Sequence, residues 1–426
     1  MIDNSLRINP DRLERSIQEL AVFGLNEHGG LDRTAFTPAE LEAREWLKAA
    51  LTSEGFSVRI DAAANIWGRR AGENLELLPP IVCGSHMDTV PNGGKYDGAL
   101  GVLMALEVLR TLDDAGIATR HPFELVSFSA EEPNPFGLST FGSRAAAGKL
   151  TREQIIRVKN PEGKLLTEAL EEAGGSPECF EQAALSKEAL SAFVEVHIEQ
   201  GRRLISRNIP IGAVTSITGI YREEVTVRGE ANHAGTTLME DRNDALTAAA
   251  EMILAAESIC RAFPDREVVG TVGQLKIIPN APNIIPAEAV FLVEFRGESK
   301  EQIGQVLTEW NLRLELLARR RPSVVTRKVI LDQAPSPMDR TIIEAIERQA
   351  GLLHIPYQRL GSMAGHDAAH LASITRSGMI FVPSVGGKSH CPEEESRISD
   401  IEQAANVLLH TLLDLDAGLD TGGRQL

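Results

Sequence analysis

The chain has 426 residues, more than one ordinary domain needs, so its length favours two hydrophobic cores. Its 60 acidic residues outnumber 43 basic ones, and no cluster of lysine and arginine offers the cations that a phosphate backbone requires. Nucleic acid is therefore excluded as a partner. A charged N-terminal segment and the lack of about 18 consecutive apolar residues indicate no signal peptide and no membrane span. Four scattered cysteines fit a reducing compartment, so we expect a cytoplasmic protein whose metals, if any, are held by histidines and carboxylates.

The first half of the chain alternates between helical and strand patterns. Helical periodicity over 37–55 precedes a short apolar run over 79–86, and a second helical pattern over 98–116 precedes strand-like runs over 122–130 and 191–201. This alternation predicts an α/β domain with a mostly parallel sheet covered by helices. Ligands of such sheets gather at the carboxyl ends of the strands.

The pattern changes near Ala213 and returns to the first style after about residue 330. Between these points strands and helices follow in the order strand, helix, strand, strand, helix, strand, which is typical of a ferredoxin-like domain. The strands are expected at 223–230, 268–278, 287–298 and 323–330, and the helices at 242–263 and 300–320. We therefore predict a catalytic domain formed by 1–212 and 331–426, interrupted by a smaller α+β domain at 213–330.

Polar residues follow the apolar strands of the catalytic domain. His86 ends one strand and Asp97 lies between Tyr96 and Gly98, a pair that alone fits a metal loop and an ordinary polar turn about equally. Glu131 and Glu132 come directly after another strand, where hydrophobic burial gives no reason for two charges. If one of them binds a metal, the other can act as a general base beside it.

Two further histidines extend this set. His197 lies at the end of the strand in "VEVHIEQG", and His390 lies in the glycine-bounded loop "VGGKSHCPEEE". The alternating fold brings three histidines and the carboxylates to one edge of the sheet. This set suits two divalent cations that share a bridging aspartate.

A competing metal motif occurs in "HDAAH", which places His366 and His370 four residues apart, as in the HExxH metalloproteases. Asp367 stands where that motif has glutamate, one methylene longer, and a third ligand would still be needed. We therefore favour a substrate-side loop that opens a helix.

Several motifs together resemble the hydantoinase/carbamoylase family of dinuclear metal-dependent amidohydrolases, within the metallopeptidase and aminoacylase superfamily. This family includes N-carbamoyl-L-amino-acid hydrolases, allantoate amidohydrolases and β-ureidopropionases. The resemblance implies a metallopeptidase-like catalytic domain with an inserted lid and dimerisation domain. It rests on "GSHMDTVPNGGKYDG", "AEEPNPFG", "HIEQG", "ANHAGTT", "PNIIP", "AGHDA" and "SHCPEE".

The same resemblance implies a role for each residue of the metal site. Two divalent ions, zinc, manganese, cobalt or nickel, are expected in each subunit. Asp88 would orient an imidazole, and Glu131 would take a proton from the attacking water and return it to the leaving nitrogen. The implied ligands are His86 and His197 for the first ion, Glu132 and His390 for the second, and Asp97 as the bridge.

The resemblance also implies a homodimer in which His233 reaches the active site of the partner subunit and stabilises an oxyanion. A plain turn histidine is the alternative for His233. Arg296 would grip the carboxylate of a small N-carbamoyl or ureido substrate with its planar guanidinium. The other implied substrate residues are Gln200, Asn283, Gly365 and, more weakly, Arg222, which could equally be a surface arginine.

The expected activity is hydrolysis of N-carbamoyl-L-amino acids to the amino acid, carbon dioxide and ammonia. Allantoate amidohydrolase and β-ureidopropionase activities stay open, and a metal-free scaffold relative is a more distant alternative. Three departures from the family pattern leave the metal ligands intact but affect the expected substrate pocket. They are Leu238 in place of proline, Met363 in place of glycine, and Asn134-Pro135 in place of glycine and arginine.

Overall fold

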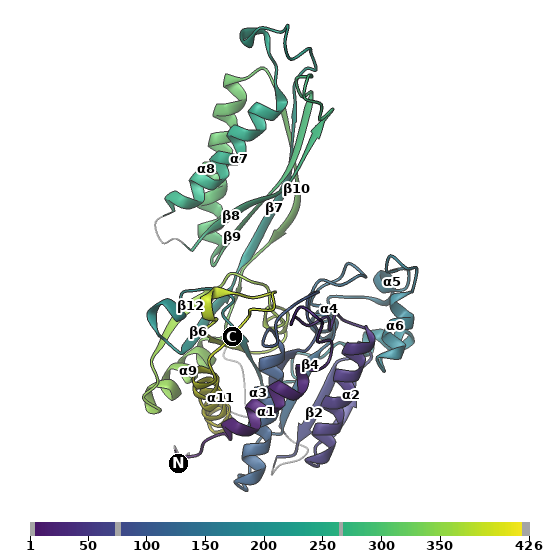
Figure 1. The fold of residues 1–426 in the computed structure, drawn as a ribbon. Helices are drawn as coiled ribbons and strands as arrows, with labels where there is room; N and C mark the ends of the chain where they lie inside the picture. The colour runs from purple at the N-terminus through teal and green to yellow at the C-terminus, as the bar shows by residue number, and fades with distance from the viewer. Residues whose placement is uncertain (1–4, 73–77, 264–266, 420–426) are drawn as a thin grey trace. The chain divides into compact units, whose positions relative to one another are not determined.

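The computed structural model describes residues 5–72, 78–263 and 267–419. These residues form two compact units (Figure 1). The first comprises the described residues of Met1–Thr215, Pro337–Leu360 and Gly365–Leu426, and the second those of Ser216–Ser336 and Gly361–Ala364.

The first unit is built on a nine-stranded sheet, with the order β1-β2-β4-β3-β5-β13-β6-β11 and β12 paired to β6. Its centre is parallel, because β3 pairs in parallel with β4 and β5, and β13 with β5. Every residue of these four strands is buried, as expected for parallel strands covered by helices. The central strands are β3 (Ile81–His86), β4 (Phe123–Phe128), β5 (Ala192–Ile198) and β13 (Ser377–Val382).

Shorter strands complete the two sides of this sheet. Two antiparallel strands extend it beyond β4, and the others extend it beyond β13. They are β1 (Ser57–Ile60), β2 (Ile66–Arg70), β6 (Ile211–Ile217), β11 (Ser336–Pro337) and β12 (Tyr357–Ser362).

Helices of the first unit pack on the sheet and on one another. The helix α3 contacts three central strands, and α9 and α11 contact β13 and each other. Nearly all of α3 is buried, which explains its apolar sequence. The helices are α1 (Pro10–Leu20), α2 (Pro38–Ser53), α3 (Ala99–Asp114), α4 (Phe141–Ala146), α5 (Arg152–Ile155), α6 (Leu166–Glu172), α9 (Arg340–Leu352), α10 (Ala368–Leu371) and α11 (Ile398–Gly418), with short 3₁₀ turns at Pro177–Ala183, Ile205–Arg207 and Val385–Gly387.

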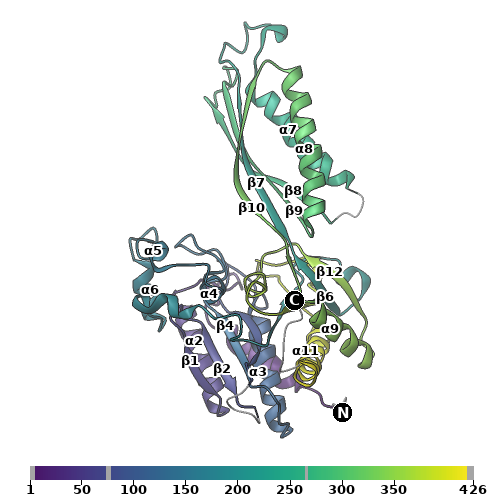
Figure 2. The ribbon, with the colours of Figure 1, turned by 180° about the vertical axis from the view of Figure 1, so that it is seen from behind.

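The second unit is an antiparallel sheet with the order β10-β7-β9-β8, and α7 and α8 cover one of its faces in both views (Figures 1 and 2). Its core contains Phe291, Phe295 and Trp310. Asp244 caps α7, and Ser299 forms a capping box with Gln302 at the start of α8. The elements are β7 (Gly219–Arg228), α7 (Ala245–Ala262), β8 (Val269–Ile278), β9 (Glu288–Gly297), α8 (Lys300–Arg320) and β10 (Val324–Gln333), with a 3₁₀ turn at Met239–Asp241.

The architecture confirms the predicted fold class, a mainly parallel α/β sheet with a separate ferredoxin-like unit. The limits of the second unit, Ser216 and Ser336, differ from the expected 213 and 330. Both expected limits fall inside strands, β6 and β10, which continue past them. At the second limit Pro335 and Pro337 flank Ser336, a local break signal that lies six residues beyond the expected limit.

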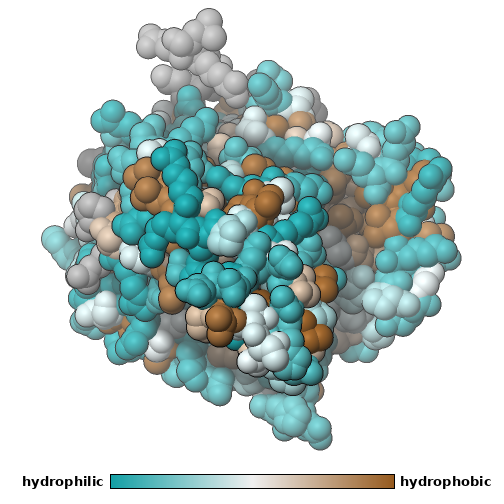
Figure 3. Space-filling model, turned by 90° about the horizontal axis from the view of Figure 1, so that it is seen from above, coloured by the Kyte–Doolittle hydropathy of each residue, from teal (hydrophilic) through white to brown (hydrophobic). Residues whose placement is uncertain are grey.

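The surface seen in Figure 3 is mostly hydrophilic, with hydrophobic residues in small groups. Within the described ranges, each helix is too short or too polar to span a lipid bilayer. Two large apolar side chains, Leu238 and Met239, are 63% and 79% exposed and follow one another in the second unit.

Candidate metal centre

The carboxyl ends of the central strands carry the predicted site residues. His86 is the last residue of β3 and pairs with Phe128 at the end of β4, three positions before Glu131. His197 is the penultimate residue of β5 and pairs with Phe381 of β13. Because these strands are parallel, their ends meet at one edge of the sheet, as the sequence predicts.

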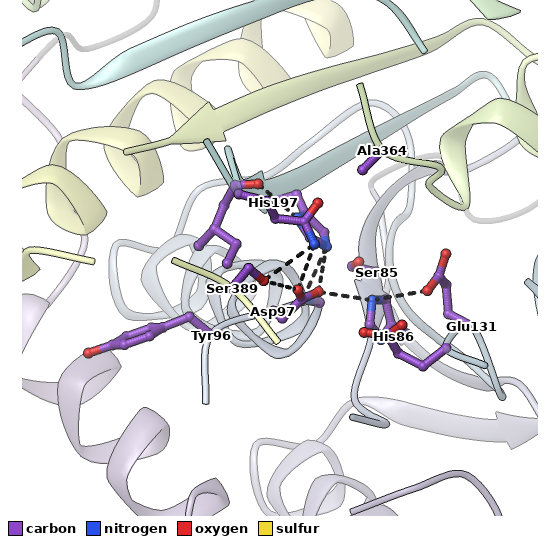
Figure 4. Close-up of polar contacts among 12 residues, drawn as sticks. Ser85, His86, Tyr96, Asp97, Glu131, His197, Ala364 and Ser389 are labelled. Atoms are coloured by element: carbon purple, nitrogen blue, oxygen red, sulfur yellow. Dashed lines mark hydrogen bonds and ion pairs between the residues drawn. The ribbon is translucent and has the colours of Figure 1, made fainter. Parts of the chain in front are cut away.

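Two groups of side chains at this edge could each hold a cation, and they share Asp97. In the first group, Oδ1 of Asp97 lies 3.1 Å from Nε2 of His197 and 3.7 Å from Nε2 of His86 (Figure 4). In the second, Nε2 of His390 lies 3.3 Å from Oδ2 of Asp97 and 3.2 Å from Oε1 of Glu132. The structure thus brings together all five predicted ligands.

The hydrogen bonds of two imidazoles suit them for metal binding. Nδ1 of His86 donates to the carbonyl oxygen of Asp88 at 3.0 Å, and Nδ1 of His197 donates to that of Ile198 at 2.9 Å. In each neutral ring the proton on Nδ1 leaves a lone pair on Nε2, and both Nε2 atoms lie within 3.7 Å of Oδ1 of Asp97, although that of His197 also accepts the N–H of Gly98. Three acceptors that converge in this way fit a divalent cation.

The electrostatics of the cluster favour positive charge. Burial alone would raise the pKa of Asp97, but His197, His390 and His86 hold it well below its ordinary value. Hydrogen bonds to Asp97 and Glu132 raise the pKa of His390 to about 10. Burial opposes the charging of His86, yet Glu131 and neighbouring carboxylates raise its pKa well above the usual range. A site with this preference for protons also favours cations.

Glu131 lies beside the first group, with Oε2 3.7 Å from Nε2 of His86 (Figure 4). Burial, reinforced by Asp367 and Glu132 against the attraction of His86, raises its pKa well above the ordinary value. A carboxylate with a raised pKa next to candidate metal ligands is suited to general acid–base chemistry. The residue before it, Ala130, has a φ of 50°, a left-handed conformation that turns the chain after β4.

Asp88 does more than the expected orientation of an imidazole. Its carboxylate oxygens accept the backbone N–H groups of Glu131 at 3.2 Å and Glu132 at 3.0 Å. The contact of its Oδ1 with Nδ1 of His86 is longer, 3.5 Å, than that made by its own carbonyl oxygen. Asp88 therefore holds the adjacent glutamates in place by their backbone.

Gly98 allows the loop of Asp97 to pass close to His86. Its φ is 63°, and a Cβ atom at this position would lie 2.3 Å from the His86 ring. The N–H of Gly98 also donates to Nε2 of His197 at 3.2 Å. Only glycine fits both the conformation and the space.

The sequence did not point to two residues that hold Asp97 in place, one through its carboxylate and one through its backbone. The hydroxyl of Ser389 donates to Oδ2 of Asp97 at 2.6 Å, and Oε1 of Glu394 accepts the N–H groups of Tyr96 and Asp97 at 2.9 and 3.0 Å. Both residues belong to "KSHCPEEE", so their closeness to His390 was the available signal. The burial of Glu394 could not be read from a run of three glutamates.

Gln200, expected to contact substrate, lies beside the second group. Its Nε2 donates to Oδ2 of Asp97 at 2.7 Å. Its Oε1 is buried and has no hydrogen-bond partner among the described residues. This oxygen is thus available to accept an N–H from a ligand.

The histidines of "HDAAH" do not share a helical face. His366 precedes α10 and packs edge-to-face against His197, with ring centroids 4.4 Å apart, whereas Nε2 of His370 contacts the hydroxyl of Thr140 at 2.9 Å. The preference for a loop opening a helix over an HExxH-like pair therefore agrees with the structure.

The expected carboxylate clamp belongs to the second unit. Nε of Arg296 donates to Oε1 of Glu294 at 2.7 Å, and its Nη1 donates to the carbonyl of Met363 at 3.0 Å. Arg222 bonds the other oxygen of Glu294 through two nitrogens. The two arginines thus share one carboxylate, which leaves a net positive charge among these three residues.

The remaining predicted residues are divided between the units. His233 is exposed, and the N–H of the following Ala234 donates to the carbonyl of Asn283 at 3.0 Å, so these segments of the second unit are neighbours. Gly365 belongs to the first unit, where a Cβ atom at this position would meet nothing within 4 Å.

The sequence profile of Peptidase family M20/M25/M40 matches residues 82–414, a span that includes all five candidate ligands. The chain belongs to this family. An N-carbamoyl-L-amino acid amidohydrolase of Geobacillus stearothermophilus is 38% identical over 411 residues, which cover 96% of this chain and 100% of that protein. An allantoate amidohydrolase of Bacillus subtilis (strain 168) is 33% identical, with 94% of this chain and 96% of that protein covered.

Solved structures support the same placement. An amidase of the hydantoinase/carbamoylase family from Burkholderia multivorans superposes with a TM-score of 0.89 at 33% identity, covering 96% of this chain and 98% of that one. The predicted resemblance to the hydantoinase/carbamoylase branch is therefore confirmed.

Proposed function

We propose that this M20-family chain is a metal-dependent amidohydrolase that hydrolyses the carbamoyl or ureido C–N bond of N-carbamoyl-L-amino acids. The products are the free amino acid, carbon dioxide and ammonia. One observation carries the proposal: Nε2 of His86 and Nε2 of His197 both approach Oδ1 of Asp97, and Oε2 of Glu131 lies 3.7 Å from the same nitrogen of His86. The naming of the Geobacillus stearothermophilus relative supports the choice of substrate.

Two divalent cations fit the two groups of residues around Asp97. His86 and His197 would hold one, Glu132 and His390 the other, and Asp97 both, with zinc, manganese, cobalt or nickel as candidates. When bound, the cations supply a Lewis acid for the substrate carbonyl and make water more acidic. The alternative of a metal-free scaffold loses support, because the ligand set and Glu131 are complete.

Glu131 serves as the general base. Its carboxylate takes a proton from the water that attacks the carbonyl carbon, and it later returns this proton to the nitrogen as the C–N bond breaks. Oε2 of Glu131 lies 3.7 Å from Nε2 of His86, so this carboxylate lies beside the candidate metal ligands without being one of them. Asp88 contributes by fixing the backbone of Glu131 and Glu132.

The substrate carboxylate is bound by Arg296, which Glu294 and the Met363 carbonyl hold in place. Asn283 adds a hydrogen bond in this assignment, and Gly365 contributes an open backbone position, where a Cβ atom would meet nothing within 4 Å. The unpartnered Oε1 of Gln200 accepts a substrate N–H. Arg222 has a lesser part in this assignment, since it is bonded to Glu294 alone, whereas Arg296 is also held by the Met363 carbonyl.

The active enzyme is a homodimer in this proposal, and His233 donates a hydrogen bond to the oxyanion in the partner subunit. Two features of the second unit support it: His233 is exposed, and the exposed apolar side chains of Leu238 and Met239 follow it closely in the chain. An exposed apolar pair of this kind is suited to coverage by another chain. We place the dimer in the cytoplasm, in line with its scattered cysteines.

Ammonia release by the metal-loaded protein tests the substrate. The panel contains N-carbamoyl-L-amino acids with several side chains, N-carbamoyl-β-alanine and allantoate, each at equal concentration. We expect the highest kcat/KM for an N-carbamoyl-L-amino acid. A general preference for allantoate would replace the proposed substrate while leaving the site assignment intact, and the Bacillus subtilis relative makes this the natural competitor.

A further inference from the structure

The loop between β7 and α7 holds the imidazole of His233 against its own backbone. Nδ1 of His233 accepts the N–H of Gly235 at 3.0 Å and the N–H of Thr236 at 3.2 Å. Two donors directed at one ring nitrogen require a lone pair there, not a proton. The neutral ring therefore carries its proton on Nε2.

This tautomer makes His233 a hydrogen-bond donor at the nitrogen that points away from the loop backbone. A ring with its proton on Nδ1 would lose both backbone hydrogen bonds and would present a lone pair instead. The loop thus selects the form of His233 that can stabilise negative charge on an oxygen, and disfavours the form that could accept a proton.

Gly235 leaves room for this arrangement. A Cβ atom added at this position would lie 3.2 Å from Cε1 and 3.5 Å from Nδ1 of His233. The first distance is closer than ordinary van der Waals contact, so a side chain here would press on the ring. Glycine in "NHAGTT" is explained by the approach of the imidazole to the backbone.

Arg242, which lies near the C-terminal end of this loop, donates hydrogen bonds to two of its carbonyl groups. Its Nη2 donates to the carbonyl oxygen of Ala234 at 2.6 Å, and its Nε donates to that of Thr237 at 3.2 Å. These two carbonyls flank Gly235 and Thr236, whose N–H groups bind His233. The guanidinium therefore bridges the two ends of the segment that orients the ring.

Other bonds anchor the backbone of the loop but do not reach the ring. The hydroxyl of Thr237 donates to the carbonyl of His233 at 2.8 Å, and Oδ1 of Asn232 accepts the N–H of His233 at 2.8 Å. The N–H of Ala234 bonds Asn283. With the backbone anchored, the direction of the two N–H groups toward Nδ1 depends on the turn that Arg242 spans.

We propose that Arg242 is a positioning residue for His233: it shapes the 234–237 turn so that two backbone N–H groups hold the imidazole as an Nε2–H donor. The use of that donor on an oxyanion rests on the proposed function. The positioning itself is a property of the second unit alone, and it can be measured without turnover.

The first experiment measures amide hydrogen exchange at Gly235 and Thr236 in the full-length protein. We expect Arg242→Gln to speed exchange at both amides by about tenfold, the effect of releasing one hydrogen bond. His233→Ala should do the same, because it removes the acceptor. Arg261→Gln is the matched control, since Arg261 is an exposed arginine of the same unit that pairs with Glu257. Unchanged exchange in Arg242→Gln would overturn the proposal.

The second experiment measures steady-state kinetics for a double-mutant cycle with metal content held equal. We expect His233→Ala to lower kcat by about 100- to 1,000-fold, and Arg242→Gln to lower it by about tenfold, with little change in KM. The double variant should match His233→Ala, because Arg242 acts through the ring. If kcat of the double variant falls by the product of the two single-variant factors, Arg242 acts by another route and the proposal is overturned.

Two further variants distinguish a loss of ring positioning from a loss of folding. Arg242→Lys keeps the charge but loses the planar fork, so it should recover part of the lost kcat. Gly235→Ala keeps Arg242 and displaces the ring, so it should lower kcat while leaving the melting temperature near that of the parent. If exchange responds as expected but His233→Ala keeps full activity, the positioning stands and the oxyanion role in the proposed function fails.

Discussion

The carboxylate of Asp88 accepts the backbone N–H of Glu131, and its second oxygen accepts the N–H of Glu132. One side chain thus fixes both a candidate base and a candidate ligand, while its own carbonyl oxygen orients His86. Asp88→Asn replaces one of the accepting oxygens by an NH₂ group, which cannot accept. We expect metal affinity to fall about 10- to 100-fold, as for other residues that orient ligands, measured by titration of the apo protein.

Asp416→Asn is the matched control for this change. Asp416 is also buried and accepts the backbone N–H groups of Arg120 and His121, but it does so at the C-terminal helix α11. Its replacement should lower the melting temperature without changing metal affinity. Equal loss of metal affinity in both variants would contradict a specific role for Asp88.

The same control variant gives a pH prediction. Burial alone would raise the pKa of Asp416, but hydrogen bonds from His121 and Arg120 lower it below its ordinary value of 3.8. A lowered folded pKa stabilises the protein fully above the unfolded value and loses this contribution as pH falls through the folded one. The melting temperatures of the parent and Asp416→Asn should therefore differ most near neutral pH and converge below about pH 4. A gap that widens in acid would contradict the assignment.

Replacement of Glu131 tests the general base. Glu131→Gln keeps the size of the side chain but cannot accept a proton, so we expect kcat to fall by about 100- to 10,000-fold. Bound metal, measured by elemental analysis, should stay at the parental level because Glu131 is not among the candidate ligands. Near-full turnover with metal bound would show that another group is the base.

The shared carboxylate predicts a pattern of metal loss. His197→Ala and His390→Ala each damage one group, so each should reduce bound metal from two equivalents to one after dialysis. Asp97→Asn damages both groups and should leave less than one equivalent. Chelation of the parent protein should also lower its melting temperature, since ions that bind the folded state stabilise it. Loss of both ions in every variant would argue against two separable groups.

The two arginines that share Glu294 should differ in their effect on substrate. Arg296→Lys loses the fork held by Glu294 and Met363, so KM should rise about 10- to 100-fold, the worth of a charge-assisted hydrogen bond. Arg222→Lys should raise KM by less, because Arg222 is bonded to Glu294 alone and is not also oriented by the Met363 carbonyl. Steady-state kinetics on the preferred N-carbamoyl amino acid measure both, and equal effects would make Arg222 a full member of the clamp.

Local patterns in the sequence were enough to predict the types of the candidate ligands and their placement at one sheet edge. Uniformly apolar runs indicate buried parallel strands, and parallel strands end at the same edge, so His86, Glu132 and His197 had to converge. The alternation of strands and helices likewise predicted the ferredoxin-like second unit. These inferences depend on burial and periodicity, which each short segment carries by itself.

The tertiary structure decided which atoms of these residues face one another. Glu394 binds the N–H groups of Tyr96 and Asp97 across nearly 300 positions of the chain, and no local pattern marks that contact. The carbonyls beside His86 and His197 select their tautomers, and the turn spanned by Arg242 selects that of His233. Hydrogen bonds are directional, so these tautomers depend on how the folded backbone orients each group, even where the partner is only one to three residues away.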